Sequence, residues 1–339
     1  MKNKFSEKFE LEGTQKDFQF VDIKLWTDQL LFIDPSLIAN AQHKENQNGN
    51  IETNYATRAH NSLQSFFSTF FEMFKDISPS KLIKKKDQGR EGINRDERIL
   101  NLLQYSTENN DLHLGYTVDE SKGTGCSPKM IYDLFSNMKF KHTSMFDFIN
   151  EPFHATGFIN EIGKDRSTDL TVSIILDVLC DFTLSICTQY SIPTQKFENY
   201  RHYWDPNEKM WKTRNYDLPF NDINNKREAI VLVPKSFVTN KFQYDADYVL
   251  KNYILKEKLD ELRTQYPSER WVENDALKKL RLEHPGSFNK DLVLEYFVDK
   301  PGSYKDFMRR VNNGILGTHK GLLTDDKIEK ATSKTQEED

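Results

Sequence analysis

The sequence predicts a helix-rich α+β fold with a small mixed sheet. Three observations lead to this fold class. Residues 54–77 carry phenylalanines at helical spacing, and residues 170–187 are the most apolar stretch of the chain. Residues 229–233 (AIVLV) form a short apolar run closed by Pro234. The first two patterns are typical of core helices, and the third is typical of a buried strand.

The individual elements follow from local signals along the chain. Asn54 is a candidate cap for the Phe-rich helix, Ser127-Pro128 is a typical helix start, and Asp34-Pro35 closes a short apolar run at residues 30–33. In chain order we expect extended structure at 18–38, a helix at 54–77, a basic loop at 78–98, a short helix at 99–103, a helix at 127–137, a long helix at 171–190, a hairpin at 203–214, a strand at 229–233, a helix at 245–263 and shorter helices to 313.

These elements suggest three parts of the chain. Residues 1–195 form a helix-rich N-terminal part that contains the long buried helix. Residues 196–320 hold the hairpin and the strand, followed by the C-terminal helices. Residues 321–339 are polar, which predicts a disordered tail. The strands at residues 30–33, 203–214 and 229–233 would together form the small sheet.

Charge and cysteine usage indicate a cytoplasmic protein. The 47 Lys and Arg residues nearly balance the 52 Asp and Glu residues, giving a net charge of −5, which argues against a general polyanion binder. No stretch has the ~20 apolar residues that a spanning helix needs, so we expect no membrane association. Cys180 and Cys187 would lie about 10 Å apart on one helix, too far for a disulfide, and Cys126 is left over.

A stripe of carboxylates is the first candidate for chemistry. Glu161, Asp165 and Asp169 are spaced by four residues, and Asp177 and Asp181 continue this spacing. Four-residue spacing puts side chains on one helical face, although Gly163 would separate Glu161 from the rest. Asp165 and Asp169 are therefore candidate catalytic residues and ligands for Mg²⁺, which binds one or two carboxylates plus water. A solvated helix edge and a helix cap are the structural alternatives.

Lys235 is a candidate catalytic residue at the end of the strand at 229–233. Nucleases of the PD-(D/E)xK type combine metal-binding acids with a Lys that polarises the phosphate or positions water. Val233 stands where that pattern has an acid, so the motif itself is absent. A surface Lys at a strand end is the alternative.

Two further segments suggest binding. Gly123 and Gly125 precede the helix start at Ser127 and could approach a phosphate, but no G-x-x-x-x-G-K motif is present. Aromatic and basic residues alternate at 197–216, as in surfaces that stack bases and hold phosphates. The candidate nucleic-acid-binding residues there are Arg201, Trp204, Lys209, Trp211 and Lys212. The same composition also suits a β-hairpin that turns at Asp205-Pro206-Asn207.

Four blocks resemble a family of uncharacterised bacterial proteins associated with phage-defence gene neighbourhoods: residues 32–35 (FIDP), 114–116 (LGY), 162–171 (IGKDRSTDLT) and 232–235 (LVPK). The resemblance covers about residues 25–240 and implies a setting, not a mechanism. The leading hypothesis is a component of an antiviral defence system, with a metal-dependent nuclease acting on phosphodiesters as its candidate activity. The alternative is a non-catalytic sensor or partner subunit that binds another protein. A site that joins Asp165 and Asp169 to Lys235 favours the enzyme, whereas Arg-paired carboxylates favour the partner.

Overall fold

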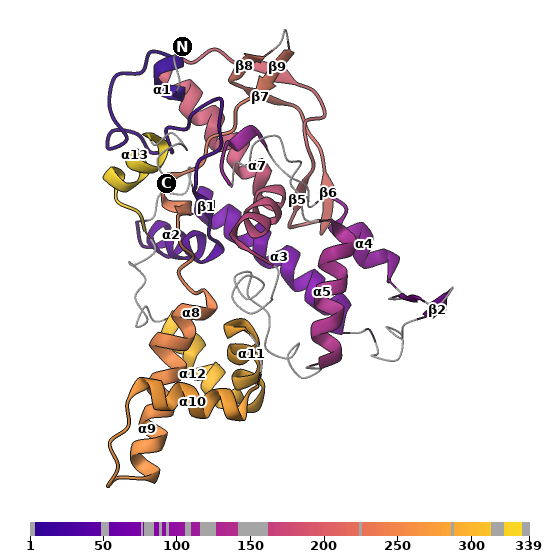
Figure 1. The fold of residues 1–339 in the computed structure, drawn as a ribbon. Helices are drawn as coiled ribbons and strands as arrows, with labels where there is room; N and C mark the ends of the chain where they lie inside the picture. Colours follow the sequence, from indigo (N-terminus) through magenta and orange to yellow (C-terminus); the bar gives the residue numbers. More distant parts are fainter. Residues whose placement is uncertain are drawn as a thin grey trace.

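The protein has the helix-rich α+β fold that the sequence predicts (Figure 1). The structure is a computed structural model. It describes residues 4–48, 54–75, 77, 85–87, 90–92, 95–105, 110–115, 127–141, 162–223, 226–285, 288–312 and 322–333. The helices are α1 (Phe5–Lys8), α2 (Pro35–Asn48), α3 (Tyr55–Lys75), α4 (Glu97–Leu103), α5 (Pro128–Lys141), α7 (Lys164–Tyr190), α8 (Ala246–Val249), α9 (Leu255–Gln265), α10 (Glu273–Glu283), α11 (Asn289–Asp299), α12 (Pro301–Asn312) and α13 (Asp325–Ser333).

The long helix α7 lies at the centre of the protein. It contacts α3, β1, β5 and β7, and Ile174, Ile175 and Leu179 are fully buried. The helix begins seven residues before the predicted Thr171, because Gly163 is extended and caps it at Lys164. By length and composition α7 could cross a membrane, but 78% of its most apolar window is buried inside the protein. It is therefore built as the core helix of a soluble protein.

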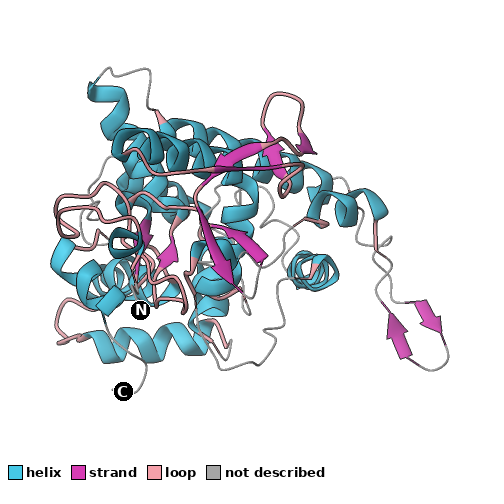
Figure 2. Ribbon diagram, turned by 90° about the horizontal axis from the view of Figure 1, so that it is seen from above, coloured by secondary structure: helices cyan, strands magenta, loops and turns pink. Residues whose placement is uncertain are grey.

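The strands pair two by two (Figure 2). They are β1 (Phe32–Ile33), β2 (Lys85–Asp87), β3 (Arg90–Gly92), β4 (Gln195–Phe197), β5 (Tyr203–Asp205), β6 (Met210–Lys212), β7 (Tyr216–Leu218), β8 (Phe220–Ile223), β9 (Lys226–Ala229) and β10 (Val238–Thr239). The antiparallel pairs are β1 with β10, β2 with β3, β4 with β7, β5 with β6, and β8 with β9. In the described residues the predicted sheet is thus divided into separate pairs, and the loop expected at 78–98 contains the β2–β3 hairpin.

The predicted strand at 229–233 is buried but belongs to no ladder beyond Ala229. Residues 230–233 are fully buried, as the apolar run indicates. Their backbone groups bond to four different parts of the chain, whereas a strand bonds in a regular ladder to one or two neighbouring strands; the N–H of Ile230 donates to the carbonyl of Pro219. The N–H of Val231 donates to the carbonyl of Asp111, the N–H of Leu232 donates to Thr183 Oγ1, and the carbonyl of Val233 accepts from Val21.

The Phe-rich helix is confirmed as a core element. In α3, Phe66, Phe70 and Phe74 are almost fully buried, and Phe70 and Phe74 both contact Phe135 of α5. The predicted start of α5 is also confirmed, because the hydroxyl of Ser127 accepts a hydrogen bond of 3.3 Å from the N–H of Met130. Helical spacing and a cap signal are local properties, and here they decide the structure.

The division expected at residue 195 runs through one hydrophobic core. β5 and β7, which follow that residue, pack on α7, which precedes it. The elements described after residue 245 are helices: α8 continues through a π-helical segment at Leu250–Ile254 into α9, and α8 to α12 gather at one end of the molecule (Figure 1).

The expectation of a disordered tail from residue 321 is wrong for residues 325–333. These residues form α13, whose Ile328 and Thr332 are fully buried. The polar average composition of this segment does not reveal a helix that buries one face.

Candidate functional site

The start of α7 brings together the residues that the sequence singled out as a possible acidic site. Asp165 and Asp169 lie one turn apart on α7, and both are partly buried. Gly115 has a φ of +134°, and a Cβ placed on it would lie 2.6 Å from Oδ1 of Asp165. The carboxylate of Asp165 therefore lies directly against the backbone of Gly115, and both the backbone conformation and the space require glycine there.

The neighbouring strand fixes this end of α7. The N–H of Ile33 in β1 donates to Thr168 Oγ1 at 3.1 Å, and that hydroxyl donates to the carbonyl of Lys164 at 2.8 Å. Gln29 holds the turn that carries Gly115, because its backbone carbonyl accepts a hydrogen bond of 3.0 Å from the N–H of Gly115. The acidic face is thus positioned by backbone contacts from two separate segments.

Two lysines converge on the same end of the helix. Lys164 donates to the carbonyl of Asn240 at 2.9 Å, and its ammonium lies 4.9 Å from the ring centre of Phe32. Lys290 of α11 donates to the carbonyl of Ile162 at 2.9 Å. Burial lowers the pKa of both side chains, that of Lys290 to about 8. An amine with this pKa can exchange a proton near neutral pH.

Lys235 is bonded to a different part of the protein. Its ammonium pairs with Oδ1 of Asp325 in α13 at 2.8 Å and donates to the carbonyl of Lys16 at 3.4 Å. Within the described residues, its polar contacts do not include Asp165 or Asp169. The buried segment that ends at Val233 directs Lys235 toward the C-terminal helix, so the structure does not assemble the predicted group of two acids and a Lys.

The other two acids of the stripe are paired with arginines. Asp177 accepts from Arg58 of α3 at 2.9 Å and lies 2.7 Å from Arg214, and Asp181 contacts the same two guanidinium groups. The hydroxyl of Tyr216 also donates to Asp177 at 3.1 Å. Burial alone would lower the pKa of Arg58, but its pairing with Asp181 and Asp177 outweighs this and raises the pKa. Asp177 and Asp181 therefore link α7 to α3 and to the segment before β7.

The predicted hairpin is confirmed, and its tryptophans face inward. β5 pairs with β6 with Trp204 opposite Trp211. Trp204 is buried, and its indole N–H donates to the hydroxyl of Ser65 at 3.2 Å, while Trp211 donates to the carbonyl of Leu102 at 2.7 Å. Both rings pack edge-on against Phe66. In this conformation Trp204 offers no surface on which a base could stack.

The basic residues of this segment differ in their partners. Arg201 pairs with Asp111 at 2.7 Å, and Lys212 pairs with Asp205 at 2.8 Å across the hairpin. These ion pairs use the charges to hold the turn and the adjoining loop. Lys209 lies exposed in the turn with a φ of +52°.

Both residues proposed as metal ligands, Asp165 and Asp169, are described, whereas several other residues named in the sequence analysis are not. Glu161, Gly123, Gly125 and Cys126 are among those not described. In the described part of the chain, no three His, Cys, Asp or Glu side chains come close enough together to form a metal-binding group. Asp165 and Asp169 could at most supply two ligands to Mg²⁺, with water completing the shell.

The sequence analysis did not identify the basic residues that contact the acidic stripe and the start of α7. Arg58 and Arg214 neutralise the acidic stripe from positions more than 30 residues away. Lys290 reaches the start of α7 from a helix 128 residues further along the chain. Water, a cation or basic side chains can satisfy an acidic stripe, and only the tertiary structure shows that arginines do so here.

Comparisons with known proteins identify a family for this chain but no activity. Neither the curated proteins nor the solved structures gave a match to this chain. Residues 10–245, which include α7, its arginine partners and the hairpins, match the family described as a domain of unknown function (DUF8370), and the chain belongs to this family.

Proposed function

We propose that this chain is a non-catalytic subunit of a bacterial antiviral defence complex, in which it binds another protein. One observation supports the proposal: most of the charged side chains that were candidates for chemistry form ion pairs that join elements of the fold. Asp177 and Asp181 are paired with Arg58 and Arg214, and Lys235 is paired with Asp325. Charges paired in this way stabilise a defined surface and leave little for acid–base or metal chemistry.

The antiviral setting rests on the resemblance of residues 32–35, 114–116, 162–171 and 232–235 to proteins of phage-defence neighbourhoods. Defence systems act inside the bacterial cell, and we accordingly propose a cytoplasmic location. The thiols support it, because Cys180 and Cys187 are buried and free. Reduced cysteines are typical of the cytosol.

A metal-dependent nuclease is the second candidate, and one specific arrangement favours it. Asp165 and Asp169 share a face at the start of α7, and Asp165 is pressed against Gly115. Lys290, with a pKa of about 8, binds the carbonyl of Ile162 just before that face. Two carboxylates with Mg²⁺ could activate water for attack on a phosphodiester. Lys209, exposed in the hairpin turn, would then be a candidate contact for the nucleic acid.

Two measurements, one on the purified chain and one in cells, distinguish the two candidate functions. Labelled single- and double-stranded DNA and RNA are incubated with the chain and Mg²⁺, and phage restriction is measured in cells with and without the neighbouring genes. The partner function predicts no cleavage, and restriction that requires a neighbouring gene product.

The variants Asp165→Asn and Asp169→Asn complete the test, with the exposed Asp217→Asn as a matched control. If the partner function is correct, folded Asp165→Asn and Asp169→Asn restrict phage as well as the control. Mg²⁺-dependent cleavage by the wild type that both variants lose, while the control retains it, would establish the nuclease instead.

A further inference from the structure

One face of α13 carries both acidic and apolar side chains. Asp325, Ile328, Glu329 and Thr332 are spaced as neighbours on one side of a helix. Ile328 and Thr332 are fully buried against the body of the protein, and the two acids flank them. This is the pattern of an amphipathic helix laid into a groove, with apolar anchors and charged neighbours.

The surface beneath α13 is basic, and its lysines come from separate segments of the chain. Lys4 binds Glu329 at 2.6 Å, and Lys235 binds Asp325 at 2.8 Å. These two pairs lie on the buried face of α13 and are themselves partly buried.

Two outer contacts extend this surface. Lys16 lies 3.4 Å from Asp326, and both side chains are largely exposed. Lys24 donates to the carbonyl of Ser333 at 3.2 Å, at the last residue of the helix. We call Lys4, Lys16, Lys24 and Lys235 together the lysine surface. Cations at the end of a helix also complement its dipole, so the contact of Lys24 favours a helical occupant.

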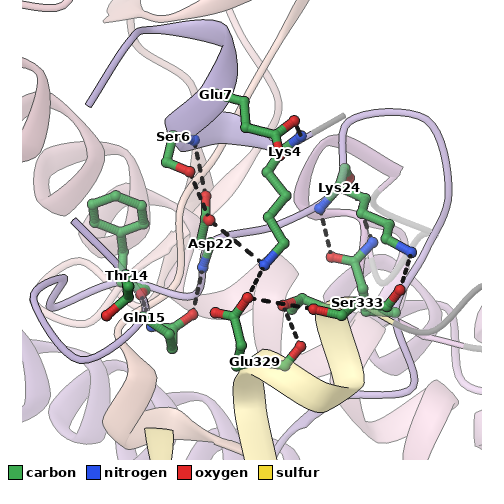
Figure 3. A network of polar contacts seen from close by, with 12 residues as sticks. Lys4, Ser6, Glu7, Thr14, Gln15, Asp22, Lys24, Glu329 and Ser333 are labelled. Carbon is green, nitrogen blue, oxygen red and sulfur yellow. Dashed lines mark hydrogen bonds and ion pairs between the residues drawn. The ribbon is translucent and has the colours of Figure 1, made fainter. Parts of the chain in front are cut away.

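The body of the protein positions Lys4. Its ammonium lies between Glu329 at 2.6 Å and the buried Asp22 at 3.9 Å (Figure 3). Asp22 is held by Ser6, whose N–H and hydroxyl donate to its two oxygens at 2.9 and 2.7 Å. The backbone N–H of Asp22 donates to Gln15 at 2.9 Å. Because these bonds belong to residues 6–22, the site for Glu329 is built without α13.

Ion pairs form much of the contact between α13 and the rest of the protein. The helix has nine residues, which is too short to be stable alone in water. Two of its side chains are buried and Ala331 packs partly buried against the core, and its polar contacts to the body include the ion pairs and the Lys24 bond. Ion pairs that reach solvent are weakened by salt, so an acidic helix of similar shape can compete for the same place.

We infer that the lysine surface is an exchangeable docking site for an acidic amphipathic helix. In the free chain α13 occupies it. In a complex the occupant is a helix of a partner protein that carries an acid, an apolar residue three positions later and an acid at the fourth. The inference rests on the proposed function, since a partner subunit needs a surface that receives another protein.

A peptide in trans tests this inference on the full-length chain. A fluorescein-labelled peptide of residues 322–333 is titrated into the wild type and into the variant Ile328→Asp/Glu329→Lys, and binding is followed by fluorescence anisotropy. The variant should release α13, so its affinity for the peptide should exceed that of the wild type at least tenfold. The affinity should fall several-fold between 50 and 500 mM NaCl.

Exchanging the charges of Lys4 and Glu329 tests whether the peptide binds at the lysine surface. Adding Lys4→Glu to the released variant should abolish the gain, and a peptide that carries Glu329→Lys should recover it. Lys8→Glu is the matched control, because Lys8 ends α1, the short helix that begins directly after Lys4, but bonds to Asn221 at 2.7 Å. The released variant that also carries Lys8→Glu should bind the native peptide as tightly as the released variant itself.

Hydrogen exchange of the α13 amides decides the remaining outcomes. If α13 is released in the variant and the peptide still does not bind, the lysine surface is not a docking site. If the α13 amides stay protected in the variant, the helix is a permanent part of the fold and the inference is wrong. Failure of the proposed function would appear separately, as Mg²⁺-dependent cleavage by the wild type.

Discussion

Arg58 of α3 and Asp181 of α7 lie 123 residues apart in the chain and form an ion pair of 2.6 Å. The same carboxylate contacts Arg214, and Asp177 one turn earlier shares both arginines. The acidic stripe of α7 is therefore a junction of three parts of the chain. Its charges hold α3 and the segment before β7 against the central helix.

This junction should show measurable coupling. We expect Arg58→Met to lower the free energy of unfolding by about 1 kcal/mol, since both partners are partly exposed and the pair is screened by water. In the Arg58→Met background, Asp181→Asn should cost about 0.5–1 kcal/mol less than in the wild type. Urea denaturation of the four chains gives the coupling energy. Lys209→Met, an exposed change in the hairpin turn, is the control and should have almost no effect; a coupling below ~0.2 kcal/mol would mean that the pair is not a structural link.

The centre of α7 should be far more sensitive than its exposed edge. Ile175 and Leu179 are fully buried, whereas Leu184 of the same helix is 39% exposed. Ile175→Ala and Leu179→Ala should each lower the free energy of unfolding by about 2–5 kcal/mol, because each leaves a cavity in the core. Leu184→Ala should cost less than ~1 kcal/mol. Losses under ~1 kcal/mol at all three positions would contradict the central place of α7 in the fold.

The sequence predicted those elements whose evidence is local. The phenylalanines of α3 and the apolar residues of α7 repeat at helical spacing, and Ser127 provides a cap that needs no distant partner. The strand at 229–233 was mispredicted beyond Ala229, since an apolar run indicates burial but not the hydrogen-bond partner. The helix α13 was missed because its only large buried apolar residue is Ile328, and its ion-pair partners Lys4 and Lys235 are distant in the chain.

The candidate site was predictable to the same limited extent. Four-residue spacing correctly placed Asp165 and Asp169 on one helical face. It could not show that Lys235 pairs with Asp325, nor that Arg58 and Arg214 neutralise the other two acids. A sequence states which charges exist, and the tertiary structure decides which of them meet.

The hairpin tryptophans should behave as core residues. Trp204 is 1% exposed and packs on Phe66, so Trp204→Ala should lower the free energy of unfolding by about 3–5 kcal/mol. Lys209→Ala, in the exposed turn directly before β6, should change it by less than ~0.5 kcal/mol. Guanidinium denaturation followed by circular dichroism measures both. If Trp204→Ala left stability unchanged and instead reduced binding of single-stranded nucleic acid, the inward position of this ring would not hold in solution.

The thiols should be inert in the folded protein. Cys180 and Cys187 are buried and free, and burial raises the pKa of both, that of Cys187 to about 12. Since the thiolate is the reactive form, neither should react with a thiol reagent until the chain unfolds. The melting temperature should be the same with and without dithiothreitol. A large decrease on adding the reductant would show that a disulfide stabilises the protein, and the cytoplasmic proposal would lose its support.

Lys290 should make stability depend on pH in the alkaline range. Burial lowers its pKa in the folded chain from 10.5 to about 8. Between these two values the unfolded chain holds a proton that the folded chain has released. The free energy of unfolding therefore rises with pH from about 8 to 10.5, and below pH 8 the cost of burying the charged ammonium is present in full.

The variant Lys290→Met removes the titrating group and keeps most of the side-chain volume. The alkaline rise, of the order of 2–3 kcal/mol in the wild type, should be absent in this variant, so the difference between the two chains should shrink as the pH increases. Urea denaturation at pH 7, 8, 9 and 10 measures it. Lys251→Met is the matched control, because Lys251 is exposed in the same group of helices and its loss should leave the pH profile unchanged. Parallel profiles for wild type and Lys290→Met would show that the ammonium is solvated in solution, and the contact between α11 and the start of α7 would then contribute nothing to a site there.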